Sequence, residues 1–249
     1  MRIATLVFDP LAPRARPASR RASAATGSGA VLLGSLLALA GCGGEGGEED
    51  QVLPSYPIET AIEGAILPSV EGFSAASSRF ERAVGAFCSG PSTSTLEGAR
   101  AEWRDLSLAW NRLVLYDFGP LDDDLIVPTI YWVESMRQRG IDYTADVREE
   151  LDAALTSSAS LDAAYFEGLR FNEVGLLALE ILLFESSAPG RPQGLDAVLS
   201  DYRRQGRKCT YLQGITGLLV ARAEGVERGW TESFEGGDPF ARQFRRERL

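Results

Sequence analysis

Apolar residues recur every three to four positions along most of the chain after residue 58, which is the spacing of amphipathic helices. The clearest run alternates steps of three and four over residues 96–113: Leu96, Ala99, Trp103, Leu106, Trp110 and Leu113. The preceding Ser94-Thr95-Leu96-Glu97 predicts a capping box at the start of this helix. No stretch alternates convincingly with a period of two, so the pattern predicts an all-α fold.

Further helices are predicted on both sides of this one. The first covers residues 62–87, where Pro68 either kinks the helix or lies in its first turn, and Ser89-Gly90-Pro91 ends it. The others are expected over residues 144–155, 161–184 and 195–230. Because the connections are short, neighbouring helices should be antiparallel, which predicts an up-and-down helix bundle.

The segment from Asp117 to Trp132 does not have a helical pattern of its own. Gly119-Pro120 and Pro128 prevent one continuous helix, whereas several side chains are too apolar for a solvated loop: Leu125, Ile126, Ile130 and Trp132. We therefore expect an ordered crossover that lies against the bundle.

An acidic run, Asp122-Asp123-Asp124, lies within this crossover. Three carboxylates could chelate a hard cation, but the run lacks the spacing and the closing glutamate of an EF-hand loop. A charge cluster at the N-terminus of a helix is the simpler interpretation.

The start of the chain has the order of a secretory signal. A short apolar run over residues 30–40 follows five basic residues: Arg2, Arg14, Arg16, Arg20 and Arg21. The apolar run is shorter than the ~20 residues that a transmembrane helix needs. It ends in Leu39-Ala40-Gly41-Cys42, which resembles the lipobox of bacterial lipoproteins, in which the cysteine is lipidated. We therefore expect a signal peptide over residues 1–41, lipidation at Cys42 and a Gly/Glu-rich tether over residues 42–52.

This resemblance implies an exported protein that is held at a membrane through its N-terminal lipid. Gly43 follows the lipidated position, as in lipoproteins sorted to the outer membrane of Gram-negative cells, facing the periplasm. Apart from the lipidated Cys42, two cysteines remain after export, Cys88 and Cys209. An even pair in an oxidising compartment favours a disulfide, which would close a long loop and stabilise the fold by ~3–5 kcal/mol. Two buried free thiols are the alternative.

Composition narrows the possible chemistry. Among 249 residues, 45% are apolar and 24% are charged, which is typical of a globular protein. The chain has no histidine, which excludes the commonest metal ligand and every catalytic mechanism that needs an imidazole. The net charge of −10 argues against a nucleic-acid partner, since phosphate binding needs a positive surface.

The segment from Gly175 through Glu180 to Phe184 resembles the signature of the imelysin-like family, GxHxxE followed by an apolar run. Other features in the same order are similar to the lipoprotein branch of that family: Pro68, Trp103, Trp110, Phe118-Gly-Pro-Leu121, Tyr131-Trp132, Arg207-Lys-Cys-Thr-Tyr-Leu212 and Trp230. The resemblance implies one helical domain over residues 53–235. It also implies that the second helical bundle of longer relatives is missing. Residues 236–249 lie outside the resemblance, and their arginines predict a solvated basic tail.

Within the motif, Gly175 and Glu180 match the first and last positions, and Leu177 occupies the histidine position. A histidine and a glutamate three residues apart share a helix face and can bind one metal ion, whereas leucine supplies no ligand. The remaining candidate ligands for iron or another divalent metal are Glu180, Glu173 and Glu134. A buried Glu180 with a hydrogen-bonded partner is the structural alternative.

The family resemblance implies either a metallopeptidase or a protein of iron uptake. Because Leu177 replaces the histidine, we expect no catalytic residues and a periplasm-facing binding protein of metal or iron acquisition. One alternative is a metal-dependent peptidase of the family. Another is an envelope scaffold that docks a partner protein through the aromatic side chains of the Phe118–Trp132 crossover.

Overall fold

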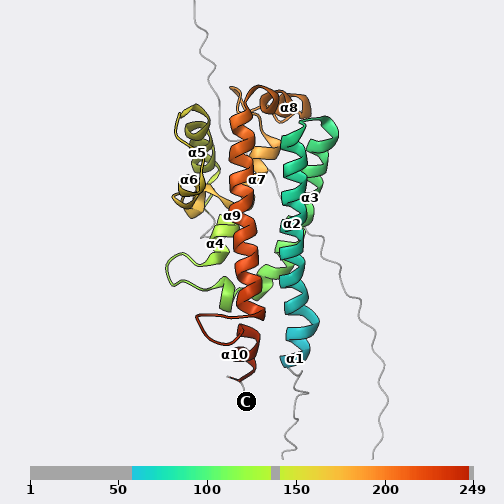
Figure 1. The fold of residues 1–249 in the computed structure, drawn as a ribbon, viewed down its shortest axis with the longest axis vertical. Helices are drawn as coiled ribbons and strands as arrows, with labels where there is room; N and C mark the ends of the chain where they lie inside the picture. The colour runs from blue at the N-terminus through green and yellow to red at the C-terminus, as the bar shows by residue number, and fades with distance from the viewer. Residues whose placement is uncertain (1–57, 136–140, 247–249) are drawn as a thin grey trace, which may run out of the picture. The chain divides into compact units, whose positions relative to one another are not determined.

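The computed structural model describes residues 58–135 and 141–246, and every regular element among them is helical (Figure 1). The predicted signal peptide, the tether and the lipidation site Cys42 lie outside the described residues. Within the described ranges, no helix is both long enough and apolar enough to cross a membrane. The predicted all-α fold is confirmed.

Four helices form the bundle: α2 (Leu67–Ser89), α3 (Thr93–Leu113), α7 (Gly175–Phe184) and α9 (Gly206–Thr231). Helices α2 and α7 each pack against both α3 and α9, so the four form a closed ring of neighbours. Their inward side chains build one continuous apolar core, and the longest two helices, α2 and α9, lie side by side in Figure 1.

The directions of these helices follow from contacts near their ends. A disulfide joins Cys88 at the end of α2 to Cys209 at the start of α9, so these two helices are antiparallel. On α3, the indole of Trp103 donates to the carbonyl of Leu176 (3.3 Å), and the earlier Arg100 donates to Leu183 (3.0 Å). Helix α7 therefore runs against α3, and the predicted up-and-down bundle is confirmed.

Shorter elements cover the bundle. One end carries α8 (Leu195–Arg204), which packs on α3, α7 and α9, and the other end carries α10 (Phe240–Arg246) (Figure 1). The remaining helices and single turns are α4 (Thr129–Val133), α5 (Thr144–Thr156), α6 (Ala163–Glu167), η2 (Val114–Tyr116), η3 (Gly119–Leu121) and η5 (Phe171–Glu173).

Pro68 lies in the first turn of α2, which is one of the two arrangements that the sequence allowed. It follows α1 (Ile58–Ala61) and a π-helical turn, η1 (Ile62–Ile66). In that turn, the N–H of Leu67 reaches back five residues to the carbonyl of Ile62. This wider turn accommodates a residue that has no N–H to donate.

The predicted capping box at the start of α3 is displaced by two residues. The capping box of α3 consists of Ser92 and Thr95, not of Ser94 and Glu97: the N–H of Thr95 donates to Ser92 Oγ (3.2 Å) and the N–H of Ser92 to Thr95 Oγ1 (3.0 Å). The threonine hydroxyl thus accepts the N-cap backbone N–H, which glutamate accepts in the usual capping box.

Two of the predicted helices are interrupted: the first contains three elements and the second contains two. Residues 161–184 contain α6, η5 and α7, because Gly175 has a left-handed backbone (φ +78°) that no helix interior admits. Residues 195–230 are divided at Gln205 (φ −126°, ψ 83°), between α8 and α9. The apolar spacing continues across both breaks because the flanking helices face the same core.

The crossover and the C-terminal segment also differ from expectation. Ile130 of the crossover is buried, but Leu125 and Ile126 are exposed, so the prediction that both pack on the bundle is wrong. Residues 240–246, expected in a solvated basic tail, form α10, whose Phe240 and Phe244 pack around Phe118. Apolar side chains thus fix this arginine-rich segment to the body.

Candidate functional site

The motif begins with Gly175, the first residue of α7. A Cβ atom at this position would lie 2.5 Å from the carbonyl oxygen of Val133 and 2.8 Å from that of Trp132. Together with the positive φ angle, this close approach to the end of α4 requires glycine. The first motif position therefore serves the packing of α7 against α4.

The other motif positions lie on the outer side of α7. Leu177 is half-buried and packs against the core. Glu180 is exposed and makes no hydrogen bond or ion pair within the described part of the chain, so the expectation of a buried carboxylate with a partner is wrong. Partial desolvation and, secondly, the charge of Glu185 raise the pKa of Glu180 above its usual value.

Glu173 is buried, but its carboxylate is fully engaged in the turn before α7. One oxygen accepts the backbone N–H of Arg170 (2.7 Å), and the other accepts the Nε–H of the same residue (2.7 Å). This paired arrangement closes the 3₁₀ turn η5 and neutralises the buried charge. Both oxygens of Glu173 therefore already accept hydrogen bonds from Arg170.

Glu134 is the third candidate ligand, and it lies at the C-terminal end of α4. It accepts a hydrogen bond of 2.5 Å from the indole N–H of Trp110 on α3. A carboxylate placed against this indole ties the crossover to the bundle, since Trp110 is itself buried in the core.

The three glutamates therefore do not form a metal site. Among the described residues, no three carboxylate or cysteine side chains come close enough to hold one ion. Two of the three glutamates accept hydrogen bonds from other residues, and the third, Glu180, offers one exposed carboxylate. This donor set does not fit a resident divalent metal, which needs several oxygen or nitrogen ligands.

The acidic run of the crossover shapes the loop around it. Asp123 accepts the backbone N–H (2.8 Å) and the hydroxyl (2.9 Å) of Thr129, the first residue of α4. Asp124 accepts the N–H groups of Val127 (3.0 Å) and Ile126 (2.7 Å), which lower the pKa of Asp124. The role of Asp123 agrees with the interpretation as a helix N-terminal charge, and the hydrogen bonds give no reason to invoke a cation.

The aromatic residues of the crossover are packed against the bundle. The ring of Phe118 contacts Trp230 (5.7 Å between centroids) and Phe244 (5.1 Å), and the indole of Trp132 lies under the guanidinium of Arg222 (4.6 Å). These aromatic side chains are half-buried rather than fully exposed, and docking of a partner protein through them stays a prediction. Leu125 and Ile126 are the exposed apolar side chains of this segment.

Sequence reasoning missed a polar cluster at the opposite end of the bundle, which we call the lysine network: Lys208, Asp201, Ser187, Glu185 and Arg148. Lys208 is the only lysine of the chain and is 0% exposed. Its ammonium donates to Asp201 Oδ2 (2.7 Å) and to the carbonyl of Glu185 (3.0 Å), and it lies over the ring of Tyr202 (4.8 Å).

Further hydrogen bonds complete this network. Asp201 Oδ2 also accepts the backbone N–H (2.9 Å) and the hydroxyl (2.6 Å) of Ser187. Burial opposes ionisation of Asp201, but the hydrogen bonds from Lys208 and Ser187 outweigh it, so the pKa of Asp201 is lowered. Glu185 accepts two hydrogen bonds from Arg148, at 2.9 Å and 2.5 Å.

Each residue of the segment Arg207-Lys208-Cys209 connects the start of α9 to another part of the fold. Arg207 donates to the carbonyl oxygens of Ala154 (2.5 Å) and Ala159 (2.6 Å), which tie the end of α5 to α9. Cys209 forms the predicted disulfide with Cys88 at a Cα separation of 5.5 Å, and the prediction is confirmed. The signal available in the sequence was a lone lysine seven residues after Asp201 within a predicted helix.

Comparison with known proteins gives one match. The family model described as Imelysin, whose short name marks a peptidase family, matches residues 66–247, which includes α10. Searches of curated proteins and of solved structures find no match. The matched range covers most of the chain and contains all four helices of the bundle. The chain therefore belongs to the imelysin family.

Proposed function

We propose that this protein is a lipid-anchored, periplasm-facing member of the imelysin family that acts by binding and not by catalysis. One observation carries the proposal: the motif keeps Gly175 for packing, has Leu177 where relatives use histidine, and leaves Glu180 exposed and unpaired among the described residues. A metallopeptidase needs a closed ligand set, an activated water and a general base. One carboxylate supplies at most one of these.

The process that we associate with this binding is metal or iron acquisition, which the family resemblance implies. In that role the chain would contribute Glu180 as a single ligand, and the other ligands would come from a partner in the envelope or from the chelator that carries the metal. A single carboxylate binds a divalent ion weakly, so we expect no tight metal site in the isolated protein.

A titration of the purified protein with ferrous and ferric iron tests this proposal. The matched variants are Glu180→Ala and Glu81→Ala, because both positions are exposed glutamates on bundle helices. We expect weak binding that Glu180→Ala reduces and that Glu81→Ala leaves unchanged. No binding, or binding that the two substitutions reduce equally, would contradict a metal role for the motif.

The family's peptidase name supports the competing function, which needs its own assay. The purified protein is incubated with a denatured protein substrate, with and without a chelator, and the products are separated by size. We expect no cleavage. Cleavage that is abolished both by the chelator and by Glu180→Ala, but not by Glu81→Ala, would establish a metallopeptidase.

A further inference from the structure

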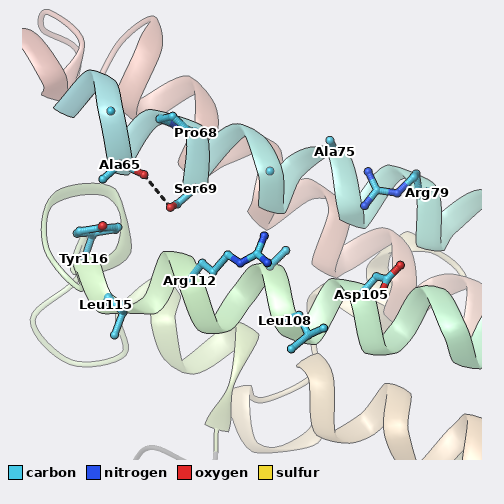
Figure 2. A pocket seen from close by; sticks show the side chains of 13 residues that line it. Ala65, Pro68, Ser69, Ala75, Arg79, Asp105, Leu108, Arg112, Leu115 and Tyr116 are labelled. Carbon is cyan, nitrogen blue, oxygen red and sulfur yellow. Dashed lines mark hydrogen bonds between the residues drawn. The ribbon is translucent and has the colours of Figure 1, made fainter. Parts of the chain in front are cut away.

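A groove runs between α2 and α3 on the face away from α7 and α9. It has a volume of about 570 Å³, and Figure 2 shows Arg79 and Arg112 reaching into the space between the two helices. The side formed by η1 and α2 consists mainly of small residues, whereas α3 and the following turn η2 carry larger ones: Asp105, Leu108, Arg112 and Leu115.

The small residues of α2 leave this groove unfilled. A Cβ atom at Gly64 or at Gly72 would meet no other atom within 4 Å, so packing within this chain does not require glycine at either position. Both lie in helical segments, where glycine costs about 0.5–1 kcal/mol relative to alanine. The chain thus leaves open space at Gly64 in η1 and at Gly72 in α2 that its own side chains do not occupy.

The facing helix carries unburied apolar side chains. Leu108 is 57% exposed and Leu115 is 72% exposed, and both line the groove. Asp105, Leu108 and Arg112 lie on one face of α3, because they are separated by steps of three and four residues, and Leu115 follows in the turn η2. One surface therefore presents both the protrusions and the hollows that could receive them.

This face carries one acidic and one basic side chain that could pair with the same two side chains of a second copy. Asp105 and Arg112 are both exposed, neither forms an ion pair within the described ranges, and seven residues place them about 10 Å apart along α3. A two-fold axis near Leu108 would set two α3 helices antiparallel. Asp105 of each copy would then face Arg112 of the other.

We propose that the α2–α3 groove is a homodimer interface in which α3 of each copy lies antiparallel along the groove of the other. Leu108 of each copy fills the hollow beside Gly72 of the partner, and two Asp105–Arg112 ion pairs form across the axis. A two-fold interface requires one patch to complement itself, and this patch has the paired charges and the paired protrusions and hollows to do so. A different partner protein could supply the opposite charge and the opposite shape itself, so it would not require both charges, or both protrusions and hollows, on this one surface.

Sedimentation equilibrium of the purified protein tests the proposal, at concentrations up to about 100 μM, where a dimer of micromolar dissociation constant is largely formed. We expect a dimer for the wild-type protein. Asp105→Arg and Arg112→Asp should each weaken it by about tenfold or more, because each places like charges opposite one another. Both positions are exposed, so the fold should be unaffected.

Mixing the two variants gives the decisive measurement. The Asp105→Arg chain carries arginine at both positions and the Arg112→Asp chain carries aspartate at both, so an equal mixture should form heterodimers. The double swap, Asp105→Arg with Arg112→Asp, should restore the homodimer. A wild-type protein that stays monomeric at the highest concentration would overturn the proposal, as would a dimer that neither single variant weakens.

A leucine pair controls for changes of surface polarity. Leu108→Asp should abolish the dimer, whereas Leu125→Asp, at an exposed leucine outside the groove, should leave it unchanged. Equal effects of the two substitutions would overturn the proposed interface.

Discussion

The side of the bundle formed by α7, α8 and α9 and the face formed by α2 and α3 use polar residues in opposite ways. On the α7–α9 side, Lys208 and Asp201 are buried, at 0% and 1% exposed, and they pair with each other. On the α2–α3 face, Asp105 and Arg112 remain in solvent beside exposed leucines. We call the α7–α9 side closed, because its buried charges are paired within the chain, and the α2–α3 face open, because Asp105 and Arg112 are exposed and unpaired among the described residues.

This difference shows where residue identity is dictated by the fold. Removing one member of a buried ion pair leaves an uncompensated charge, whereas surface substitutions away from special features change stability little. The α7–α9 side should thus tolerate few changes, and the α2–α3 face should tolerate many without unfolding. Five substitutions or conditions test this contrast, from the largest expected effect to the smallest.

The largest effect is expected for Lys208→Met, which keeps the side-chain volume but leaves Asp201 charged and buried. We expect the free energy of unfolding to fall by about 3–5 kcal/mol, measured by urea denaturation. The double variant Lys208→Met/Asp201→Asn removes both charges and should recover most of that loss. A loss of under about 1 kcal/mol in the single variant would show that the lysine network does not hold this side together.

Removal of the disulfide should come next. The double variant Cys88→Ser/Cys209→Ser frees a cross-link between residues 121 positions apart, which should cost about 3 kcal/mol through the larger entropy of the unfolded chain. Reduction of the wild-type protein should shift the urea midpoint by a similar amount. If oxidised and reduced proteins unfold at the same urea concentration, the cross-link does not stabilise the fold.

A pair of glycines compares the two sides directly. Gly175→Ala should destabilise the protein by about 2 kcal/mol, since alanine adopts the left-handed backbone poorly and its Cβ would collide with the Val133 carbonyl. Gly72→Ala should stabilise the monomer by about 0.5–1 kcal/mol, because nothing opposes its Cβ. Unfolding is followed at low protein concentration. The same sign for both variants would remove the contrast.

Acid should weaken the closed side before the open face. The folded-state pKa of Asp201 lies below 3.8, so the unfolded chain binds a proton at a pH where the folded chain does not. The stabilisation by Asp201 is fully present above the pKa of the unfolded chain. It is lost as the pH falls from that value toward the lower folded-state pKa, by at most about 1.4 kcal/mol per pH unit for one proton. Urea denaturation at pH 5, 4 and 3 measures the slope, which should be shallower in Lys208→Met/Asp201→Asn.

The smallest effect is expected on the α2–α3 face. Leu108→Ser should change the free energy of unfolding of the monomer by less than about 0.5 kcal/mol, because the side chain is already largely in solvent. Leu106→Ser, two residues earlier and fully buried, should cost several times more. Similar losses for both variants would mean that the groove is part of the core.

Much of the bundle could be predicted from periodicity, because the apolar positions that define α2, α3 and α9 are the positions that the core buries. The breaks at Gly175 and Gln205 could not, since the spacing of apolar residues is the same on both sides of each break. A left-handed glycine is recognised only when its neighbours are known, here the carbonyl oxygens at the end of α4.

The candidate site was predicted less well. Glu173 and Glu180 are seven residues apart, which would place them on one face of a continuous helix, but Glu173 lies in the turn η5, where its carboxylate contacts Arg170. The disulfide was predicted because only two cysteines besides the lipidated Cys42 remain after the proposed cleavage. The partners of Lys208 come from Asp201, seven residues earlier, and from the end of α7, and the contact with α7 follows from the packing of these helices.

The burial of Lys208 also makes the reactivity of its side chain a measure of local unfolding. Since it is the only lysine, the folded surface among the described residues offers no ε-amino group to acylating reagents or to lysine-specific proteases. Side-chain labelling or cleavage at Lys208 then requires the junction between α8 and α9 to open. The rate of either reaction measures how often that opening occurs, without any introduced probe.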